Sequence, residues 1–351
     1  MKHIPFFSIG LVTYDRPLML IEAIKSVLDQ TFDDYELIIG NDNPEKTISA
    51  STVGIDDPRL VFVNNTRNVG EINNLNLVLE KARGRYFTWL GDDDAYFPTF
   101  FESVHKSLEE FGPLPCVFTS YYAGSHYPRD AEITIVADGK LFEGRKFLSQ
   151  YLERNIRLQG CYGVFDKECI KKMGGMEELN PGFSPGSDQL LAIRCGSLER
   201  VIYIDAPLIF YRTHPGSLSL TSPDIDAYRN SQIKIFREAC DIFKKEGAIQ
   251  EAQLNAFLLL LWHLDDYLHV MNRSGRLQWA KLIRYISYVL IQSRRLGKNR
   301  NRIVHVLSRK VLFLLVHENM IGNRSLPRRF AKHIWSPETM DRLKSYLRKQ
   351  M

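Results

Sequence analysis

Three consecutive aspartates, Asp92, Asp93 and Asp94, have the clearest chemical potential in this sequence. Alternate side chains of an extended segment point the same way, so we expect Asp92 and Asp94 to converge. Carboxylates this close repel one another unless positive charge lies between them. Mg²⁺ or Mn²⁺, which prefer oxygen ligands, would supply that charge. The alternative is a solvated acidic turn in front of a helix that begins near Pro98.

The elements that must position these aspartates are strands and helices in alternation. Apolar runs at 6–12, 35–40, 60–64 and 86–90 are typical of buried strands. Helical spacing follows Pro17 and again follows Gly70. This alternation predicts an α/β fold with a parallel, doubly wound sheet, in which ligands bind beyond the carboxyl ends of the strands.

Polar residues gather at those predicted strand ends. Thr13 and Asp15 follow the first strand, Asn41 and Asp42 the second, and Arg67 the third. The sequence has no GxGxxG after the first strand and no GxxxxGK[ST]. A nucleotide that binds here would therefore need metal and carboxylates in place of a glycine-rich loop.

The second half of this region continues the pattern. We expect a helix over 98–111, strands over 116–122, 159–165 and 201–211, and irregular structure over 123–144. Asp188 stands near the start of a short predicted helix, 189–194, where aspartate is a common N-cap. His214 follows the last strand as a surface residue or a ligand. Arg212 is a diphosphate contact or a salt-bridge partner.

Residues 6–220 resemble the family 2 glycosyltransferases in five motifs that occur in the family's order. These are FFSIGLVTYDRP, YELIIGNDN, RNVGEINNLNLVLEKARGRYFTWLGDDD, the SDQLLAIRCGSLERVIYID helix and strand, and YRTHPGS. The resemblance implies a GT-A fold and a nucleotide-sugar donor. Gly91 and Asn41 depart from the family pattern, where acidic residues are usual. The GDDD form is more similar to the branch of abequosyl- and deoxysugar transferases of surface polysaccharides.

The resemblance also implies roles for individual residues. Asp188 matches the catalytic base, and Asp92, Asp94 and His214 are the expected ligands of Mn²⁺ or Mg²⁺. The expected contacts to the donor nucleotide come from the strand ends and the acidic turn, namely Thr13, Asp15, Asn41, Asp42, Arg67, Asp92 and Asp93.

The predicted reaction is inverting transfer of a sugar from a nucleotide diphosphate to a hydroxyl of a glycan or polyprenyl-linked acceptor. The family resemblance favours synthesis of bacterial surface polysaccharide such as O-antigen or capsule. A sugar-phosphate nucleotidyltransferase is one alternative, but the segment 13–17 lacks the phosphate loop that such an enzyme needs. A non-catalytic scaffold that binds carbohydrate or membrane is the other alternative.

The length of 351 residues suits a catalytic domain over 1–220 and a further region over 221–351. Five cysteines without a CxxC pattern favour reduced thiols in the cytoplasm. No apolar run approaches the roughly 20 residues that span a bilayer, so we expect no transmembrane helix. The segment 263–269, HLDDYLH, has His and Asp at helical spacing, but we interpret it as part of a helix core and not as a metal site.

The region from 221 onward has helical spacing over 225–245, 250–271, 277–293 and 302–317. From Gln292 to Met351 it contains fifteen Lys or Arg and three Asp or Glu, a net charge of +12. Because the whole chain carries +5, residues 1–291 carry −7. A basic helical tail predicts peripheral attachment to an anionic membrane surface at the cytoplasmic face. Nothing in the sequence resembles a nucleic-acid-reading element, and we expect no such partner.

Overall fold

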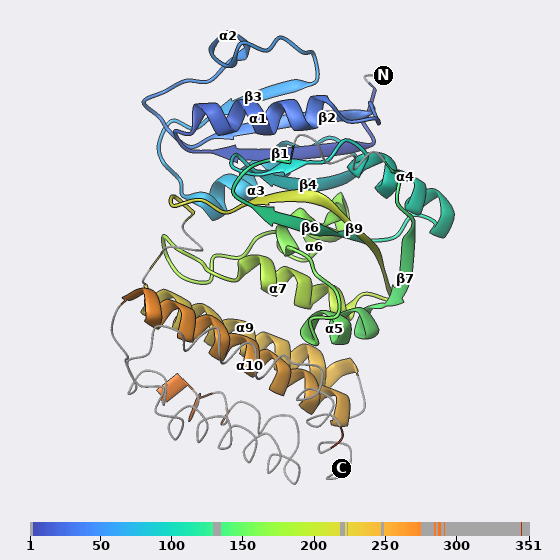
Figure 1. Cartoon of the computed structure of the whole chain (residues 1–351), viewed down its shortest axis with the longest axis vertical. Helices are drawn as coiled ribbons and strands as arrows, with labels where there is room; N and C mark the ends of the chain where they lie inside the picture. Colours follow the sequence, from blue (N-terminus) through green and yellow to red (C-terminus); the bar gives the residue numbers. More distant parts are fainter. Residues whose placement is uncertain are drawn as a thin grey trace. The chain divides into compact units, whose positions relative to one another are not determined.

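The computed structural model describes residues 3–128, 135–217, 222, 224–246, 249–274, 284, 285, 287, 288, 291 and 345. The chain divides into two compact units (Figure 1). The first runs to Phe183 and resumes over Ser187–Pro215, and the second comprises Ser184–Gly186 and the described residues from Gly216 onward.

The first half of the sheet in the first unit is parallel, as the sequence predicts. Strands β1 (Phe7–Thr13), β2 (Tyr35–Asn41), β3 (Leu60–Asn64) and β4 (Tyr86–Gly91) lie in the order β3-β2-β1-β4. All three of these pairings are parallel. The carboxyl ends of these strands therefore meet at one edge.

The second half of the sheet is mixed. Strand β8 (Val164–Asp166) runs antiparallel between β4 and β6 (Cys116–Gly124), and β6 pairs in parallel with β9 (Arg200–Arg212). The short β5 (Ala95–Tyr96) and β7 (Gly139–Glu143) pair antiparallel with β9. The strand expected over 159–165 is wrong in its first part, because Gly160–Tyr162 forms the 3-10 helix η1.

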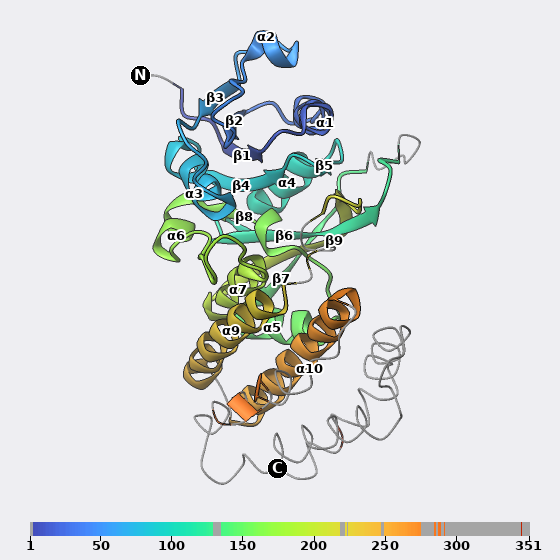
Figure 2. The same cartoon turned by 90° about the vertical axis from the view of Figure 1, so that its left-hand side faces the viewer.

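Helices cover both faces of the sheet. Figure 2 shows α1 (Pro17–Leu28) and α4 (Phe100–Phe111) on one face, and α3 (Glu71–Lys81) and α6 (Lys167–Lys172) on the other. The apolar stripe of α1 packs with buried residues of β1 and α4 in one core cluster. On the opposite face α3 lies close to the sheet, since a Cβ atom at Gly10 would stand 2.5 Å from Val78.

Shorter elements complete the first unit. They are α2 (Ala50–Val53), α5 (Gly144–Leu152), α7 (Ser187–Arg194) and the 3-10 helix η2 (Cys195–Ser197). The segment 123–144, for which we expect irregular structure, contains the end of β6 and also β7 within its described residues.

The second unit contains the long helices α9 (Ile225–Glu246) and α10 (Ile249–Ser274), where helical spacing predicts them. His263 is buried in α10, and its Nδ1 lies 2.7 Å from the hydroxyl of Tyr285. Along the described helices, none is both long and apolar enough to cross a bilayer. The helices expected over 277–293 and 302–317 and the basic tail from Gln292 lie outside the described residues, apart from positions 284, 285, 287, 288, 291 and 345.

Candidate active site

The three aspartates form a tight turn after β4. The backbone N–H of Asp94 donates to the carbonyl of Gly91 at 3.3 Å, so this segment is not extended. The alternation that would make Asp92 and Asp94 converge is therefore absent, and their carboxylates bind different partners.

Asp92 is buried against the end of β1. Its Oδ2 accepts a hydrogen bond from Thr13 Oγ1 at 2.6 Å, and its Oδ1 accepts one from Arg16 Nη1 at 2.9 Å. Burial raises the pKa of Asp92, whereas the hydroxyl of Thr13 and the charge of Arg16 oppose that shift. Thr13 thus contacts the acidic turn as a structural partner of Asp92.

Asp93 is the most exposed of the three, with 20% of its side chain accessible. Its Oδ2 lies 3.1 Å from the same Arg16 nitrogen and 2.9 Å from His214 Nε2. Arg16, a residue that our sequence analysis did not select, bridges two carboxylates of the turn. His214 reaches the turn as expected, but its aspartate neighbour is Asp93.

Asp94 points into the protein and has 3% of its surface exposed. The hydroxyl of Tyr162 donates to its Oδ2, and the backbone N–H of Arg212 donates to its Oδ1 at 2.6 Å. Burial and the neighbouring charge of Asp93 raise the pKa of Asp94 well above its usual value. This carboxyl therefore holds the turn to η1 and β9.

Arg212 also ties the turn to α1. Its Nη2 lies 2.6 Å from Glu22 Oε2, and its Nε donates to the carbonyl of Asp93 at 2.7 Å. Of the two roles left open by the sequence, the geometry favours the salt-bridge partner.

Asp188 lies in the first turn of α7, in the same compact unit as the acidic turn. Its carboxylate accepts hydrogen bonds from the backbone N–H groups of Gln189, Gly160 and Asp188 itself. Burial raises the pKa of Asp188, and these three donors oppose the shift. The helix N-terminus thus stabilises the carboxylate as an anion.

A further carboxylate, Glu71, begins helix α3 and lies within electrostatic reach of both Asp93 and Asp188. Its side chain reaches solvent, but surrounding protein removes part of the water, and this desolvation together with the charges of Asp93 and Asp188 raises its pKa. An acidic residue at a helix N-terminus is common, so the sequence signal indicates only a favourable charge for α3. Asp93 and Asp188 are therefore both close enough to Glu71 for their charges to act on it.

Two residues that we expect to contact the nucleotide form hydrogen bonds with the protein backbone. Asn41 is 1% exposed, and its Nδ2 donates to the carbonyls of Asn43 and Lys46. Asp42 accepts hydrogen bonds from the backbone N–H groups of Val69 at 2.8 Å and Gly70 at 2.9 Å. Both side chains therefore organise the loops around the site.

Asp15 adopts a left-handed backbone conformation with φ of 56°, which is uncommon for a residue with a side chain. Its carboxylate lies 2.5 Å from Lys46 Nζ, and both side chains are largely exposed. This ion pair links the loop after β1 to the loop after β2, at the strand edge where a ligand is expected.

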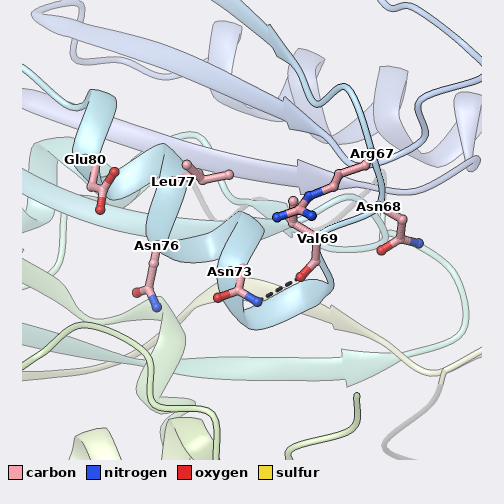
Figure 3. A pocket seen from close by; sticks show the side chains of 7 residues that line it. All are labelled: Arg67, Asn68, Val69, Asn73, Asn76, Leu77 and Glu80. Carbon is pink, nitrogen blue, oxygen red and sulfur yellow. Dashed lines mark hydrogen bonds between the residues drawn. The ribbon is translucent and has the colours of Figure 1, made fainter. Parts of the chain in front are cut away.

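Arg67 lines a pocket of about 460 Å³ beside α3, and none of the three aspartates lines this pocket (Figure 3). The pocket is lined by the segment 67–69 and by one face of the helix, namely Asn73, Asn76, Leu77 and Glu80. Asn73 Nδ2 donates to the carbonyl of Val69 at 2.8 Å, as the dashed line in Figure 3 marks.

The chemistry of these groups suits a divalent cation only at one edge of the turn. In the described part of the chain, no three His, Cys, Asp or Glu side chains form a metal-binding group. Both oxygens of Asp92 and both of Asp94 already accept hydrogen bonds from protein donors. Asp93 differs because its contacts to Arg16 and His214 both involve Oδ2, so Asp93 and His214 are the pair that fits a cation with water among its other ligands.

Comparisons with known proteins show what the N-terminal part of the chain is similar to. Residues 8–168 match the sequence profile of the family described as "Glycosyl transferase family 2". The putative colanic acid biosynthesis glycosyl transferase WcaA of Escherichia coli K12 is 34% identical over 100 residues, which are 28% of this chain and 36% of that protein. The GalNAc(5)-diNAcBac-PP-undecaprenol beta-1,3-glucosyltransferase of Campylobacter jejuni is 34% identical over 93 residues, which are 26% of this chain and 30% of that protein.

The chain thus spans about a third of the length of each of these two relatives. Among solved structures, S. aureus TarS 1-349 in complex with UDP-GlcNAc has a TM-score of 0.59 at 14% identity, covering 92% of this chain and 91% of that one. At this identity the likeness concerns the fold, an α/β GT-A domain with a helical addition. The N-terminal part of the chain, residues 8–168, is thus similar to glycosyl transferase family 2.

Proposed function

We propose that this protein transfers a sugar from a nucleotide-diphosphate donor to a hydroxyl of a glycan or lipid-linked acceptor. The observation that supports it best is that the acidic turn and Asp188 lie in the same compact unit and that Asp93 and Asp188 both act on the charge of Glu71. Transfer needs a site for the departing diphosphate and a base for the acceptor at opposite sides of one sugar. The turn and Asp188 are suited to these two tasks.

The donor side consists of the acidic turn and the loops after β1 and β2. Asp93 and His214 would hold Mn²⁺ or Mg²⁺, which when bound offsets negative charge on the diphosphate. Arg16 donates hydrogen bonds to the carboxylates of both Asp92 and Asp93 and so fixes their positions relative to each other. Asp15, on the exposed rim, remains the candidate for a contact to the ribose or base, and Arg67 is a more distant one.

The acceptor side is Asp188. Its raised pKa brings its basicity closer to neutral pH, as efficient general-base catalysis requires. The three backbone N–H groups fix the carboxylate while it accepts the proton of the attacking hydroxyl. One base and direct displacement of the diphosphate lead to inversion at the anomeric carbon.

The relatives' names guide the choice of acceptor. One refers to colanic acid biosynthesis and one to an undecaprenol-linked glycan. We therefore place this reaction in bacterial polysaccharide biosynthesis, of which lipopolysaccharide O-antigen and capsule are the proposed instances. The basic tail in the sequence would attach the protein peripherally to the cytoplasmic face of the membrane.

The proposal is tested by a thermal-shift screen of UDP, GDP, dTDP and CDP, each with and without MnCl₂. A ligand that binds only the folded protein raises the melting temperature. We expect one nucleotide to raise it, and to do so more strongly with Mn²⁺. Sugars linked to that nucleotide are then assayed for release of the diphosphate in the presence of lipid-linked glycan acceptors. Failure of all four nucleotides to stabilise the folded protein would argue against the proposed donor class.

A further inference from the structure

The segment Gly160–Tyr162, the 3-10 helix η1, contacts both halves of the proposed site. It precedes β8, which pairs antiparallel with β4 through Phe87 and Phe165. Because the two strands run in opposite directions, the residues before β8 lie beside the residues after β4. This topology brings η1 next to the acidic turn.

Tyr162 supplies the first of the two contacts. Its ring is buried, with 6% of the residue exposed, and its hydroxyl donates to Asp94 Oδ2. A Cβ atom at Gly91 would lie 3.3 Å from that hydroxyl and 2.9 Å from Asp93 Oδ1. The absence of a side chain at Gly91 therefore leaves the space in which the tyrosine hydroxyl and the aspartates meet.

Gly160 supplies the second contact. Its N–H donates to the carboxylate of Asp188, and its Cα faces the backbone of the same residue. A Cβ atom there would lie 1.8 Å from the carbonyl oxygen of Asp188 and 2.6 Å from the carbonyl carbon. Backbone atoms cannot rotate away as a side chain can, so any residue larger than glycine must displace Asp188 or η1.

We propose that η1 sets the distance between the base and the acidic turn, with Gly160 and Tyr162 as positioning residues. This inference rests on the proposed function in so far as Asp188 and the turn act on one substrate. The two ends of a segment three residues long are fixed to the two carboxylate groups, so neither group can move far without the other. Misplacement of reacting groups by about 1 Å can reduce a rate roughly 10²-fold.

The test compares Gly160→Ala and Tyr162→Phe with a matched control, Tyr203→Phe. Tyr203 is also a buried tyrosine of the first unit, and its hydroxyl makes hydrogen bonds of 3.2 Å to the N–H and the carbonyl of Arg157. The control thus removes a buried hydroxyl that touches neither carboxylate group. Crystal structures, melting temperatures, and kcat and KM for the best nucleotide sugar are measured for all three variants.

Gly160→Ala is expected to move the Asp188 carboxylate by about 1 Å and to lower kcat roughly 10²-fold with little change in donor KM. Tyr162→Phe is expected to shift the acidic turn and to raise donor KM several-fold. Tyr203→Phe should lower the melting temperature by an amount similar to Tyr162→Phe while kcat and KM stay within twofold of the wild type.

An unmoved Asp188 in the Gly160→Ala crystal structure would overturn the inference, whatever the activity of the wild type. So would wild-type kcat and KM in both η1 variants. If Gly160→Ala does not fold, the inference is tested by comparing kcat and KM of Tyr162→Phe with those of Tyr203→Phe. Equal values in these two variants would reject the inference. A wild type that displaces no diphosphate, with Asp188 moved in the variant, would instead refute the proposed function.

Discussion

The Nε2 atom of His214 lies 2.9 Å from Oδ2 of Asp93, although 121 residues separate the two in sequence. The end of β9 and the turn after β4 are brought together by the hydrogen bonds of Arg212 to this turn. A carboxylate and an imidazole at this distance are the groups we propose as cation ligands.

The first prediction concerns this pair. Asp93→Asn should remove the additional thermal stabilisation that Mn²⁺ gives in the presence of the nucleotide, and His214→Ala should weaken it. Transfer by the wild type should cease in EDTA and return with Mn²⁺. The control is Asp33→Asn, since Asp33 is a carboxylate with 87% of its side chain exposed. Transfer that survives thorough chelation would show that the reaction needs no bound cation.

Asp188→Asn tests the proposed base. An asparagine keeps the size of the side chain but cannot accept the acceptor proton. Loss of a general base typically lowers a rate by about 10²–10⁴-fold, and we expect kcat in that range with little change in nucleotide binding. Near wild-type turnover would leave Asp188 only its role at the start of α7.

The pH dependence of transfer should report the same carboxyl. Burial raises the pKa of Asp188, and the base works only when it is deprotonated. Activity should therefore fall as the pH falls through a value above the ordinary aspartate range. The measurement is kcat/KM of the wild type against pH, with stability checked at each pH. If kcat/KM decreased at acid pH with the pKa of an exposed aspartate, this would contradict the buried environment described for Asp188.

A variant of Asp42 tests whether this carboxylate stabilises the loops of the protein or contacts the donor nucleotide. Asp42→Ala would leave the N–H of the half-buried Val69 without its acceptor, whereas the N–H of Gly70 would keep Asn68 Oδ1, and an unsatisfied buried group costs about 1–3 kcal/mol. We expect the free energy of unfolding, measured in urea, to decrease by an amount of this order. An unchanged stability combined with weaker nucleotide binding would instead restore Asp42 to the donor site.

His263 should make the stability of the helical unit depend on pH. Burial lowers the pKa of His263 to about 3, from 6.5. Between these values the unfolded chain binds a proton that the folded chain does not. The stabilising contribution is therefore complete above about pH 6.5 and decreases as the pH falls toward 3, by up to about 1.4 kcal/mol per pH unit.

The variant His263→Gln should flatten this dependence. Urea unfolding of the wild type and the variant between pH 4 and 7 measures the difference in slope. Parallel slopes would mean that His263 is protonated in the folded protein. The neutral imidazole accepts or donates a hydrogen bond at Tyr285 in either tautomer, so the burial itself is compatible with a folded helix pair.

The sequence predicted β1 to β4 well because each is a short apolar run with a turn signal at its end. It also identified Asp188 and His214 as polar residues at element ends, although their roles remain proposals. It did not identify Arg16 or Tyr162, because their partners are 76 and 68 residues away and no local pattern encodes such a pairing. The helical character of Gly160–Tyr162 escaped prediction for a related reason, since packing against Asp188 and not local propensity determines it.

The bridge made by Arg16 has a consequence for how a donor enters. A diphosphate is an anion, and three bare carboxylates would repel it. The guanidinium between Asp92 and Asp93 keeps this edge closer to electroneutrality before any ligand arrives. A cation that binds Asp93 competes with Arg16, and the released guanidinium then needs a new anion, which the diphosphate can provide. We therefore expect cation and nucleotide to enter as one complex, by an exchange of ion-pair partners in which little net charge is gained.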